Sequence, residues 1–199
     1  MNADYIKIAN LCYEIGTLRK LPRSHRQTLL TNDDDDNIGS HSHRVACIAF
    51  ILAKLEGVDP YKTAIMALFH DIPETRSGDQ NWIHKRYVKV DEHQIINDQF
   101  SSLPFSDIFD VVSEYEQRKS KESIVAKDAD LLDQVLLLRE YEWAGNKEAT
   151  IWLEGKNKEN ANRQLVRLQT ESARKLGEQI LTINPSDWWN DLWTDKNRK

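Results

Sequence analysis

Hydrophobic residues along this chain recur mostly at intervals of three and four positions, which is the period of an amphipathic α-helix. The predicted helices cover residues 4–19, 40–57, 59–72, 91–103, 106–119, 121–142 and 158–182. No stretch alternates polar and apolar residues strongly enough to predict a β-strand. The pattern therefore predicts an all-α fold.

The second predicted helix carries local start and stop signals. Ser40 is a suitable N-cap, because its hydroxyl can accept a hydrogen bond from a free backbone N–H, and Gly57 is a suitable stop. The preceding stretch, residues 20–39, mixes Pro, Ser, His and Arg, and this composition predicts a long connecting loop. Within it, the acidic run Asp33–Asp36 is most simply a solvated loop.

The third predicted helix opens at Asp59 and has an interior, residues 63–69, that is apolar nearly all round. Such a helix is expected to be buried at the centre of the fold. It delivers His70 and Asp71 at its end, because the residue before Pro73 is biased away from helical geometry.

Composition narrows the class of protein. The 199 residues are 40% hydrophobic and 30% charged, which suits one domain over residues 1–199 with one sizeable core. With a net charge of −5, the protein has no overall positive potential to attract nucleic acid polymers or anionic membranes. Any phosphate group must therefore be bound locally, by a metal ion or by a few Arg and Lys side chains. No apolar run is long enough to cross a bilayer, and the N-terminal residues lack the pattern of a secretory signal, so we expect a cytoplasmic protein. We also expect Cys12 and Cys47 to be free thiols.

The C-terminal part is expected to complete or cap the helical bundle with helices over residues 158–194. Its tail concentrates aromatic residues in Trp188-Trp189-Asn190-Asp191-Leu192-Trp193. We expect a short helix there that packs its rings onto the body or onto a partner subunit.

Four potential metal ligands occur in apolar surroundings: His41, His70, Asp71 and Asp130. An unpaired buried carboxylate is costly, so such groups are usually neutralised by a partner or a cation. Ordinary ion pairs and hydrogen-bonded histidines are the alternative for each residue taken alone. Together, two imidazoles and two carboxylates suit one divalent ion such as Mn²⁺, Fe²⁺, Co²⁺, Mg²⁺ or Zn²⁺, which makes water a usable nucleophile and polarises a phosphoryl oxygen.

Two further acidic residues follow His70. Glu74 comes one helical turn later, provided that the turn survives Pro73, and could act as a general base. Asp79 arrives just past Gly78, so the two acids are expected to converge beside one ion. A solvent-facing Glu74 is the alternative.

These motifs, taken in order, resemble the HD-domain superfamily, specifically its 5′-deoxynucleotidase-like branch. The resemblance spans about residues 5–145 and rests on His41-Ser42-His43-Arg44-Val45-Ala46, His70-Asp71-Ile72-Pro73-Glu74 with Gly78-Asp79, and Lys127-Asp128-Ala129-Asp130. It implies an HD-type helical bundle with the metal site in its core.

The resemblance also implies a role for each matching residue. His41, His70, Asp71 and Asp130 would hold the metal, and Glu74 and Asp79 would assist the attacking water. Arg23 would bind the substrate phosphate, because the planar guanidinium group is well suited to that interaction. Such enzymes hydrolyse nucleoside 5′-monophosphates, prefer the deoxy sugar and commonly form homodimers.

Two positions depart from the family pattern. Ser40 stands where an acidic residue usually precedes the first metal histidine, and Ser24 stands where an aromatic residue tied to sugar selection usually follows the arginine. The resemblance therefore leaves the sugar, the base and the metal open. It also leaves open another HD-type nucleotide hydrolase (a phosphodiesterase, triphosphate or alarmone hydrolase), a di-iron oxygenase, which would need more ligands, and a nucleotide-binding module without activity.

Overall fold

The computed structural model describes residues 2–155, 164–192 and 196, and in this part of the chain it contains helices and no β-strand. The all-α prediction is therefore confirmed. The α-helices are α1 (Asn2–Ile15), α2 (Arg26–Leu29), α3 (Ile38–Glu56), α4 (Pro60–Phe69), α5 (Glu74–Ser77), α6 (His84–Tyr87), α7 (Glu92–Phe100), α8 (Asp107–Gln117), α9 (Lys121–Trp143), α10 (Lys147–Glu154) and α11 (Glu171–Thr182). Short 3₁₀ helices are η1 (Leu18–Lys20), η3 (Leu165–Arg167) and η4 (Asp187–Trp189).

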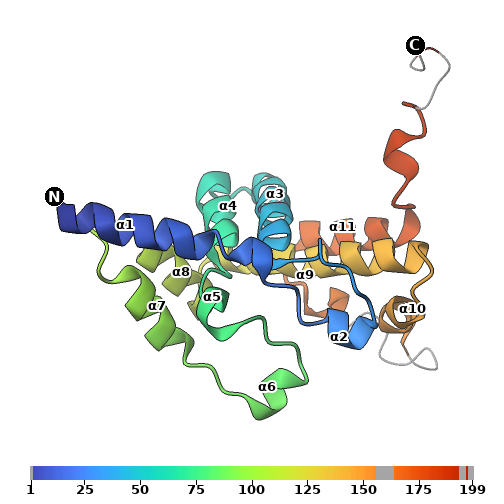
Figure 1. The fold of residues 1–199 in the computed structure, drawn as a ribbon. Coiled ribbons are helices and arrows are strands. Elements are labelled where there is room, and N and C mark those ends of the chain that lie inside the picture. Colours follow the sequence, from blue (N-terminus) through green and yellow to red (C-terminus); the bar gives the residue numbers. More distant parts are fainter. Residues whose placement is uncertain (1, 156–163, 193–195, 197–199) are drawn as a thin grey trace.

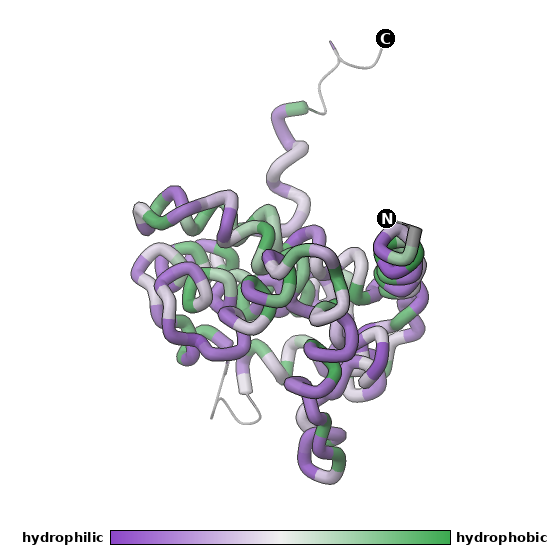
Figure 2. Tube along the Cα trace, turned by 90° about the vertical axis from the view of Figure 1, so that its left-hand side faces the viewer, coloured by the Kyte–Doolittle hydropathy of each residue, from purple (hydrophilic) through white to green (hydrophobic). Residues whose placement is uncertain are grey.

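The centre of the fold is formed by α3, α4 and α9, which all contact one another. Figure 1 shows α3 and α4 side by side against the long α9, with α8 next to α4 and with α10 and α11 along the far part of α9. Leu52, Met66 and Leu132, one from each central helix, are fully buried in the main core. Along most helices hydrophobic and hydrophilic stretches alternate at short intervals (Figure 2), as expected of helices that bury one face.

Helix α3 begins earlier than the sequence predicts. Its N-cap is Asn37, whose side chain accepts a hydrogen bond from the Ser40 backbone N–H, so the prediction of Ser40 as the cap is wrong by three residues. Ile38 is completely buried, and its burial favours the earlier start. The predicted stop is confirmed, because Gly57 caps the helix in the left-handed conformation with φ of 70°.

Helix α4 begins after Asp59 as predicted, and the Asp59 side chain accepts hydrogen bonds from two backbone N–H groups. The expectation that it is buried all round is wrong. Met66 is fully buried, but Ile65 is 46% exposed and Leu68 is 39% exposed. The helix packs on α3, α8 and α9 with one face only, and its apolar outer face is left uncovered within the described residues.

The C-terminal part differs from the predicted helix over residues 158–182, of which 158–163 lie outside the described residues. Helix α11 begins only after Thr170, because the buried carboxylate of Asp128 accepts hydrogen bonds from the backbone N–H groups of Gln169 and Thr170 and from the Thr170 hydroxyl. Those bonds hold the chain extended before the helix starts. The helix then packs on α9 and α3.

In the described part of the aromatic tail, Trp188 and Trp189 do not join the hydrophobic core. Trp188 is 72% exposed and Trp189 is 42% exposed, and the two rings meet edge to face. Together with Asp187 they form the three-residue η4, and the segment rises away from the bundle (Figure 1). Trp193 lies outside the described residues.

Two smaller expectations concern membranes and thiols. Within the described residues, no helix combines the length and the apolarity that crossing a bilayer requires. Cys12 and Cys47 are both free, and both are exposed.

Candidate metal centre

The turn after α4 fixes the positions of His70, Asp71 and Glu74. The chain continues past Phe69 in tight turns, in which the Ile72 N–H donates to the Phe69 carbonyl at 3.1 Å and the Glu74 N–H donates to the Asp71 carbonyl at 3.0 Å. The helical path thus survives Pro73, and Glu74 opens α5. The His70 Nδ1 donates to the Ala67 carbonyl at 2.6 Å, which leaves Nε2 as the free ring nitrogen.

His41, near the start of α3, is oriented by a carboxylate that the sequence analysis missed. Its Nδ1 lies 2.6 Å from the Asp133 Oδ2. Asp133 in turn accepts from the Arg44 Nε at 2.5 Å, and its side chain is only 5% exposed. This arrangement fixes the imidazole ring so that Nε2 faces Asp71 and Asp130, each at 3.3 Å. Asp133 lies three residues after Asp130 on α9, and that helical spacing is the one sequence signal that could have suggested it.

The structure brings the four predicted ligands together. One ligand atom from each of His41, His70 and Asp71 lies within 4.8 Å of the others. Asp130 joins them from α9, with its Oδ1 at 3.3 Å from the His41 Nε2 and 4.0 Å from the His70 Nε2. Both Nε2 atoms are buried and have no hydrogen-bond partner. Two unpartnered imidazole nitrogens facing two carboxylates fit a divalent cation.

Electrostatics in the site follow from burying two carboxylates beside two imidazoles. Burial and the charge of Arg23 lower the pKa of His41, but the carboxylates of Asp130, Asp133 and Asp71 outweigh them and raise it well above its ordinary value. Burial alone would raise the pKa of Asp71, but His70, His41 and Arg23 bring it well below its ordinary value. The site thus keeps its carboxylates ionised by surrounding them with positive charge.

Replacing Asp133 with asparagine is expected to weaken divalent-ion binding by about tenfold to a hundredfold, because the variant keeps the shape but loses the charge that orients the His41 ring. Isothermal titration of the metal-free protein with Mn²⁺ measures the change. Glu140→Gln is the matched control, since Glu140 pairs with Arg44 at 2.6 Å but does not contact His41. Equal affinities for wild type and Asp133→Asn would contradict this orienting role.

Unlike Asp71 and Asp130, Glu74 has a pKa that is raised rather than lowered by its surroundings. Its Oε2 is buried without a hydrogen-bond partner. Burial, together with the charges of Asp71 and Asp79, raises the pKa of Glu74 to about 9. The metal-free protein therefore holds a proton on Glu74 at neutral pH, and added positive charge is needed to release it.

This proton predicts how the stability of the metal-free protein depends on pH. The unfolded chain loses the Glu74 proton near pH 4.5, whereas the folded chain keeps it up to about pH 9. The stabilising contribution is complete below pH 4.5 and is lost as the pH rises toward 9. Urea unfolding at pH 6 and pH 8.5 should show a smaller loss of stability in Glu74→Gln than in wild type. Identical losses would mean that Glu74 titrates normally.

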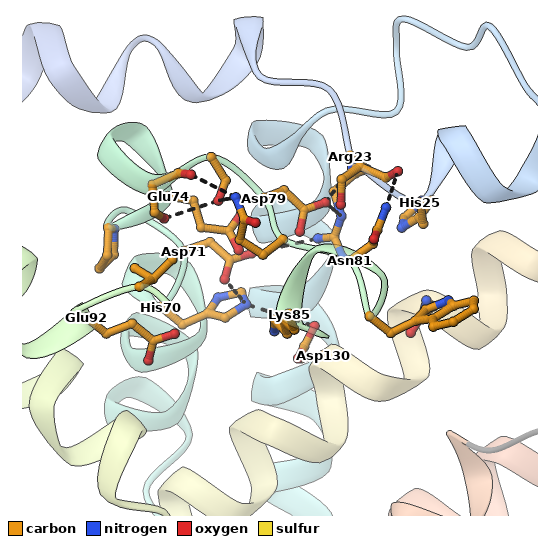
Figure 3. Close-up of a pocket in the computed structure, with 18 of the residues that line it drawn as sticks. Arg23, His25, His70, Asp71, Glu74, Asp79, Asn81, Lys85, Glu92 and Asp130 are labelled. Atoms are coloured by element: carbon orange, nitrogen blue, oxygen red, sulfur yellow. Dashed lines mark hydrogen bonds and ion pairs between the residues drawn. The ribbon is translucent and has the colours of Figure 1, made fainter. Parts of the chain in front are cut away.

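Arg23 reaches the same pocket from the connection between η1 and α2 (Figure 3). Its Nη1 lies 3.7 Å from the Asp71 Oδ2 and its Nε lies 3.6 Å from the Asp79 Oδ2. Asp79 also accepts a 2.6 Å hydrogen bond from the Ser24 backbone N–H, and the Asn81 side chain donates to the Ser24 carbonyl. Asp79 therefore fixes the segment that carries Arg23, a contact that the sequence analysis did not foresee.

The acidic run before α3 also supports Arg23. The Arg23 N–H donates to the Asp36 carbonyl at 3.0 Å, and the Asp36 side chain, 7% exposed, lies 2.8 Å from the His25 Nε2. The Tyr141 hydroxyl donates to the same carboxylate at 3.3 Å. The interpretation of this run as a solvated loop is correct for Asp34, whose side chain is 89% exposed, and wrong for Asp36.

One pocket of about 580 Å³ is lined by Arg23, His70, Asp71, Glu74, Asp79 and Asp130. His41 adjoins it, with its Nε2 3.3 Å from Asp71 and from Asp130. Figure 3 shows Arg23 facing Asp71, Glu74 and Asp79, which come from the segment after α4, with Asp130 on α9 beside them. The pocket is large enough for a small nucleotide. It offers a cation-binding set, an acid with a raised pKa and a guanidinium group, the combination needed to act on a phosphate ester.

Comparison with known proteins gives matches to both sequence and fold. A family model described as "HD domain" matches residues 15–170. A 5′-deoxynucleotidase of Dictyostelium discoideum is 27% identical over 154 residues, which is 70% of this chain and 78% of that protein. A 5′-deoxynucleotidase of Cronobacter sakazakii is 30% identical over 151 residues, 66% of this chain and 73% of that protein.

Two solved structures show the same fold. A conserved hypothetical protein from Pyrococcus furiosus gives a TM-score of 0.71 at 23% identity, covering 88% of this chain and 99% of that one. A predicted metal-dependent phosphohydrolase from Magnetospirillum magnetotacticum gives 0.67 at 23% identity, covering 90% of this chain and 91% of that one. At this identity the likeness concerns the fold alone.

Proposed function

Because this chain belongs to the HD-domain family, we propose that it is a metal-dependent phosphohydrolase that releases phosphate from a small nucleotide, a nucleoside or deoxynucleoside 5′-monophosphate. The observation that carries the proposal is the pair of unpartnered Nε2 atoms, of His41 and His70, that face two carboxylates inside a pocket. The names of the curated relatives, which are 5′-deoxynucleotidases, support the substrate class.

His41, His70, Asp71 and Asp130 would hold one divalent ion, of which Mn²⁺, Co²⁺, Fe²⁺, Mg²⁺ and Zn²⁺ all suit a set of nitrogen and oxygen ligands. When bound, such an ion supplies a more acidic water and polarises a phosphoryl oxygen. Lys127, whose Nζ lies 2.5 Å from the Asp130 Oδ2, keeps the second oxygen of that carboxylate occupied and so limits its rotation.

The remaining residues would accept the proton of the attacking water and orient the phosphate group. Glu74 would accept the proton of the attacking water once positive charge offsets the neighbouring Asp71 and Asp79. Arg23 would pair two phosphoryl oxygens with its planar fork, and its Nε is buried without a hydrogen-bond partner. Asp79 would hold Arg23 in place through Ser24.

The proposal extends to the state of the protein in the cell. We propose one domain over residues 1–199 that forms a homodimer, supported by the exposed apolar side chains Ile51, Leu55, Tyr61 and Ile65 on the outer faces of α3 and α4. The two free thiols support a cytoplasmic location, where reducing conditions keep thiols unpaired. Sedimentation equilibrium measures the oligomeric state directly.

The test is a matrix of metals against substrates. Purified protein is freed of metal, reloaded with each of the five ions and assayed for phosphate release from ribo- and deoxyribonucleoside 5′-monophosphates. We expect release with at least one ion, none after chelation, and recovery on re-addition of the ion. No release from any nucleotide with any ion would reject the proposal.

A further inference from the structure

The pocket extends beyond the proposed metal ligands along the C-terminal end of α8. This wall is formed by Tyr115, Glu116 and Arg118, and Lys85 and Glu92, from the segment before α8, line the same pocket. Figure 3 shows Glu92 and Arg23 on opposite sides of His70 and Asp71. Arg23 and Tyr115 both interact electrostatically with Asp71 and Asp130, so both lie near the proposed metal ligands. None of these α8 residues has a task in the hydrolysis described above.

Tyr115 carries a buried hydroxyl with no hydrogen-bond partner. The residue is 2% exposed, and its ring packs edge to face on the His70 ring, with centroids 5.0 Å apart. Buried hydroxyls are normally hydrogen-bonded, because burying one without a partner is costly. A phenol is protonated at neutral pH and can donate. The side chain is therefore a donor that lines the substrate pocket and finds no acceptor in the described part of the chain.

Arg118 places a second unused donor beside it. Its guanidinium carbon lies 3.3 Å from the centroid of the Tyr115 ring, and its Nη1 is buried without a hydrogen-bond partner. The nearest carboxylate is that of Glu116, at 3.9 Å from Nη2, too far for a hydrogen bond. Arg118 also ends α8 with φ of 53°, a left-handed conformation that a side chain of this size rarely adopts.

The pocket lining offers an anion a second cation besides Arg118. Lys85 lines the same pocket and forms no ion pair within the described residues. Glu116 offsets Arg118 only in part, because burial and the neighbouring Glu92 raise the pKa of Glu116 to about 7. Glu92 lines this part of the pocket as well, so both signs of charge are present, and the groups left without a hydrogen-bond partner are the donors of Tyr115 and Arg118. A phosphate group, with several acceptor oxygens and two charges, satisfies such a set.

We propose that Tyr115 and Arg118 form a second phosphate subsite, so that a nucleotide with a further phosphate group, besides the one at the proposed metal centre, binds more tightly than the monophosphate. The inference rests on the proposed function, because it assumes that the first phosphate sits at the proposed metal centre. The second phosphate could belong to a 5′-diphosphate chain or to the 3′ position of the sugar. Both sources present the same chemistry to this wall.

The experiment measures equilibrium binding to the metal-loaded full chain carrying Glu74→Gln, which slows turnover. Titration calorimetry with AMP, ADP and adenosine 3′,5′-bisphosphate compares one phosphate with two and separates the two sources. Tyr115→Phe removes only the unpartnered hydroxyl, and Arg118→Asn removes the charge with a residue that tolerates positive φ. Arg86 and Tyr87, which form a similar pair at 5.8 Å outside the pocket lining, supply the controls Arg86→Asn and Tyr87→Phe.

We expect ADP or the bisphosphate to bind about tenfold to a hundredfold more tightly than AMP, and each pocket variant to lose most of that advantage. The control variants should keep it. Equal affinities for all three nucleotides, or an advantage that survives both Tyr115→Phe and Arg118→Asn, would overturn the subsite. The readout does not depend on hydrolysis, so a protein that binds as expected but releases no phosphate would reject the proposed function alone.

Discussion

Replacing His41 with alanine is expected to abolish divalent-ion binding and to reduce phosphate release by about a thousandfold or more, whereas the same change at His43 leaves both intact. The two residues belong to the same turn of α3. His41 is buried with its Nε2 facing Asp71 and Asp130 at 3.3 Å, while His43 is exposed on another face of the helix. The two variants therefore distinguish a metal-binding histidine from a neighbouring histidine that does not bind metal.

Bound metal is measured by mass spectrometry on protein freed of loose ions, and activity by phosphate release at saturating metal. We expect close to one ion per chain in wild type and His43→Ala, and none in His41→Ala. Circular dichroism and thermal unfolding verify that His41→Ala still folds, since the change leaves the buried Asp133 with only Arg44 as a charged partner. A folded His41→Ala that retains its ion and its activity would remove His41 from the ligand set.

The helical architecture could be predicted from the sequence because each helix buries one face and so imposes its period on the chain. The bounds of α9, predicted as 121–142 and observed as Lys121–Trp143, illustrate this. Single residues at helix ends were harder to predict. Asn37 and Ser40 are both good caps, and the burial of Ile38, which the local pattern does not reveal, decides between them.

The residue types of the site could be predicted from the sequence, but the contacts between particular side chains and particular helices could not. Asp128, Asp130 and Asp133 lie within two turns of α9, yet Asp128 anchors the start of α11, Asp130 faces the two imidazoles and Asp133 orients His41. Which carboxylate meets which element depends on how α3 and α11 cross α9. Spacing along one helix carries no information on those crossings.

The residues of the α8 wall show the same limit. The helical pattern of residues 106–119 does not distinguish Tyr115 and Arg118 from the other residues of an amphipathic helix, and only the packing of α8 against α4 brings the Tyr115 ring onto His70. The sequence pattern does not reveal that the Tyr115 hydroxyl is buried without a hydrogen-bond partner. Such a group is recognised from accessible surface and hydrogen bonding in three dimensions.

Replacing Glu74 with glutamine is expected to lower kcat by about a hundredfold to ten-thousandfold while the protein still binds its divalent ion. The amide keeps the size of the carboxyl group but cannot take up a proton at neutral pH. The variant also removes an ionisable group, whose pKa burial raises to about 9 in the metal-free protein and which added positive charge would lower. The dependence of kcat on pH should therefore lose the limb that reports the ionisation of Glu74. Steady-state kinetics between pH 5.5 and 9 at saturating metal measure both effects.

Asp79→Asn provides the contrast that tells a base from a residue that orients the substrate. Asp79 accepts a hydrogen bond from the Ser24 N–H and lies 3.6 Å from the Arg23 Nε, so its loss should disturb Arg23 and act mainly on KM. Glu74 makes no such contact, and its Oε2 is left without a hydrogen-bond partner in the pocket. If Glu74→Gln instead kept its kcat and Asp79→Asn lost it, Asp79 would be the residue that takes the proton, and Glu74 would serve only to balance charge.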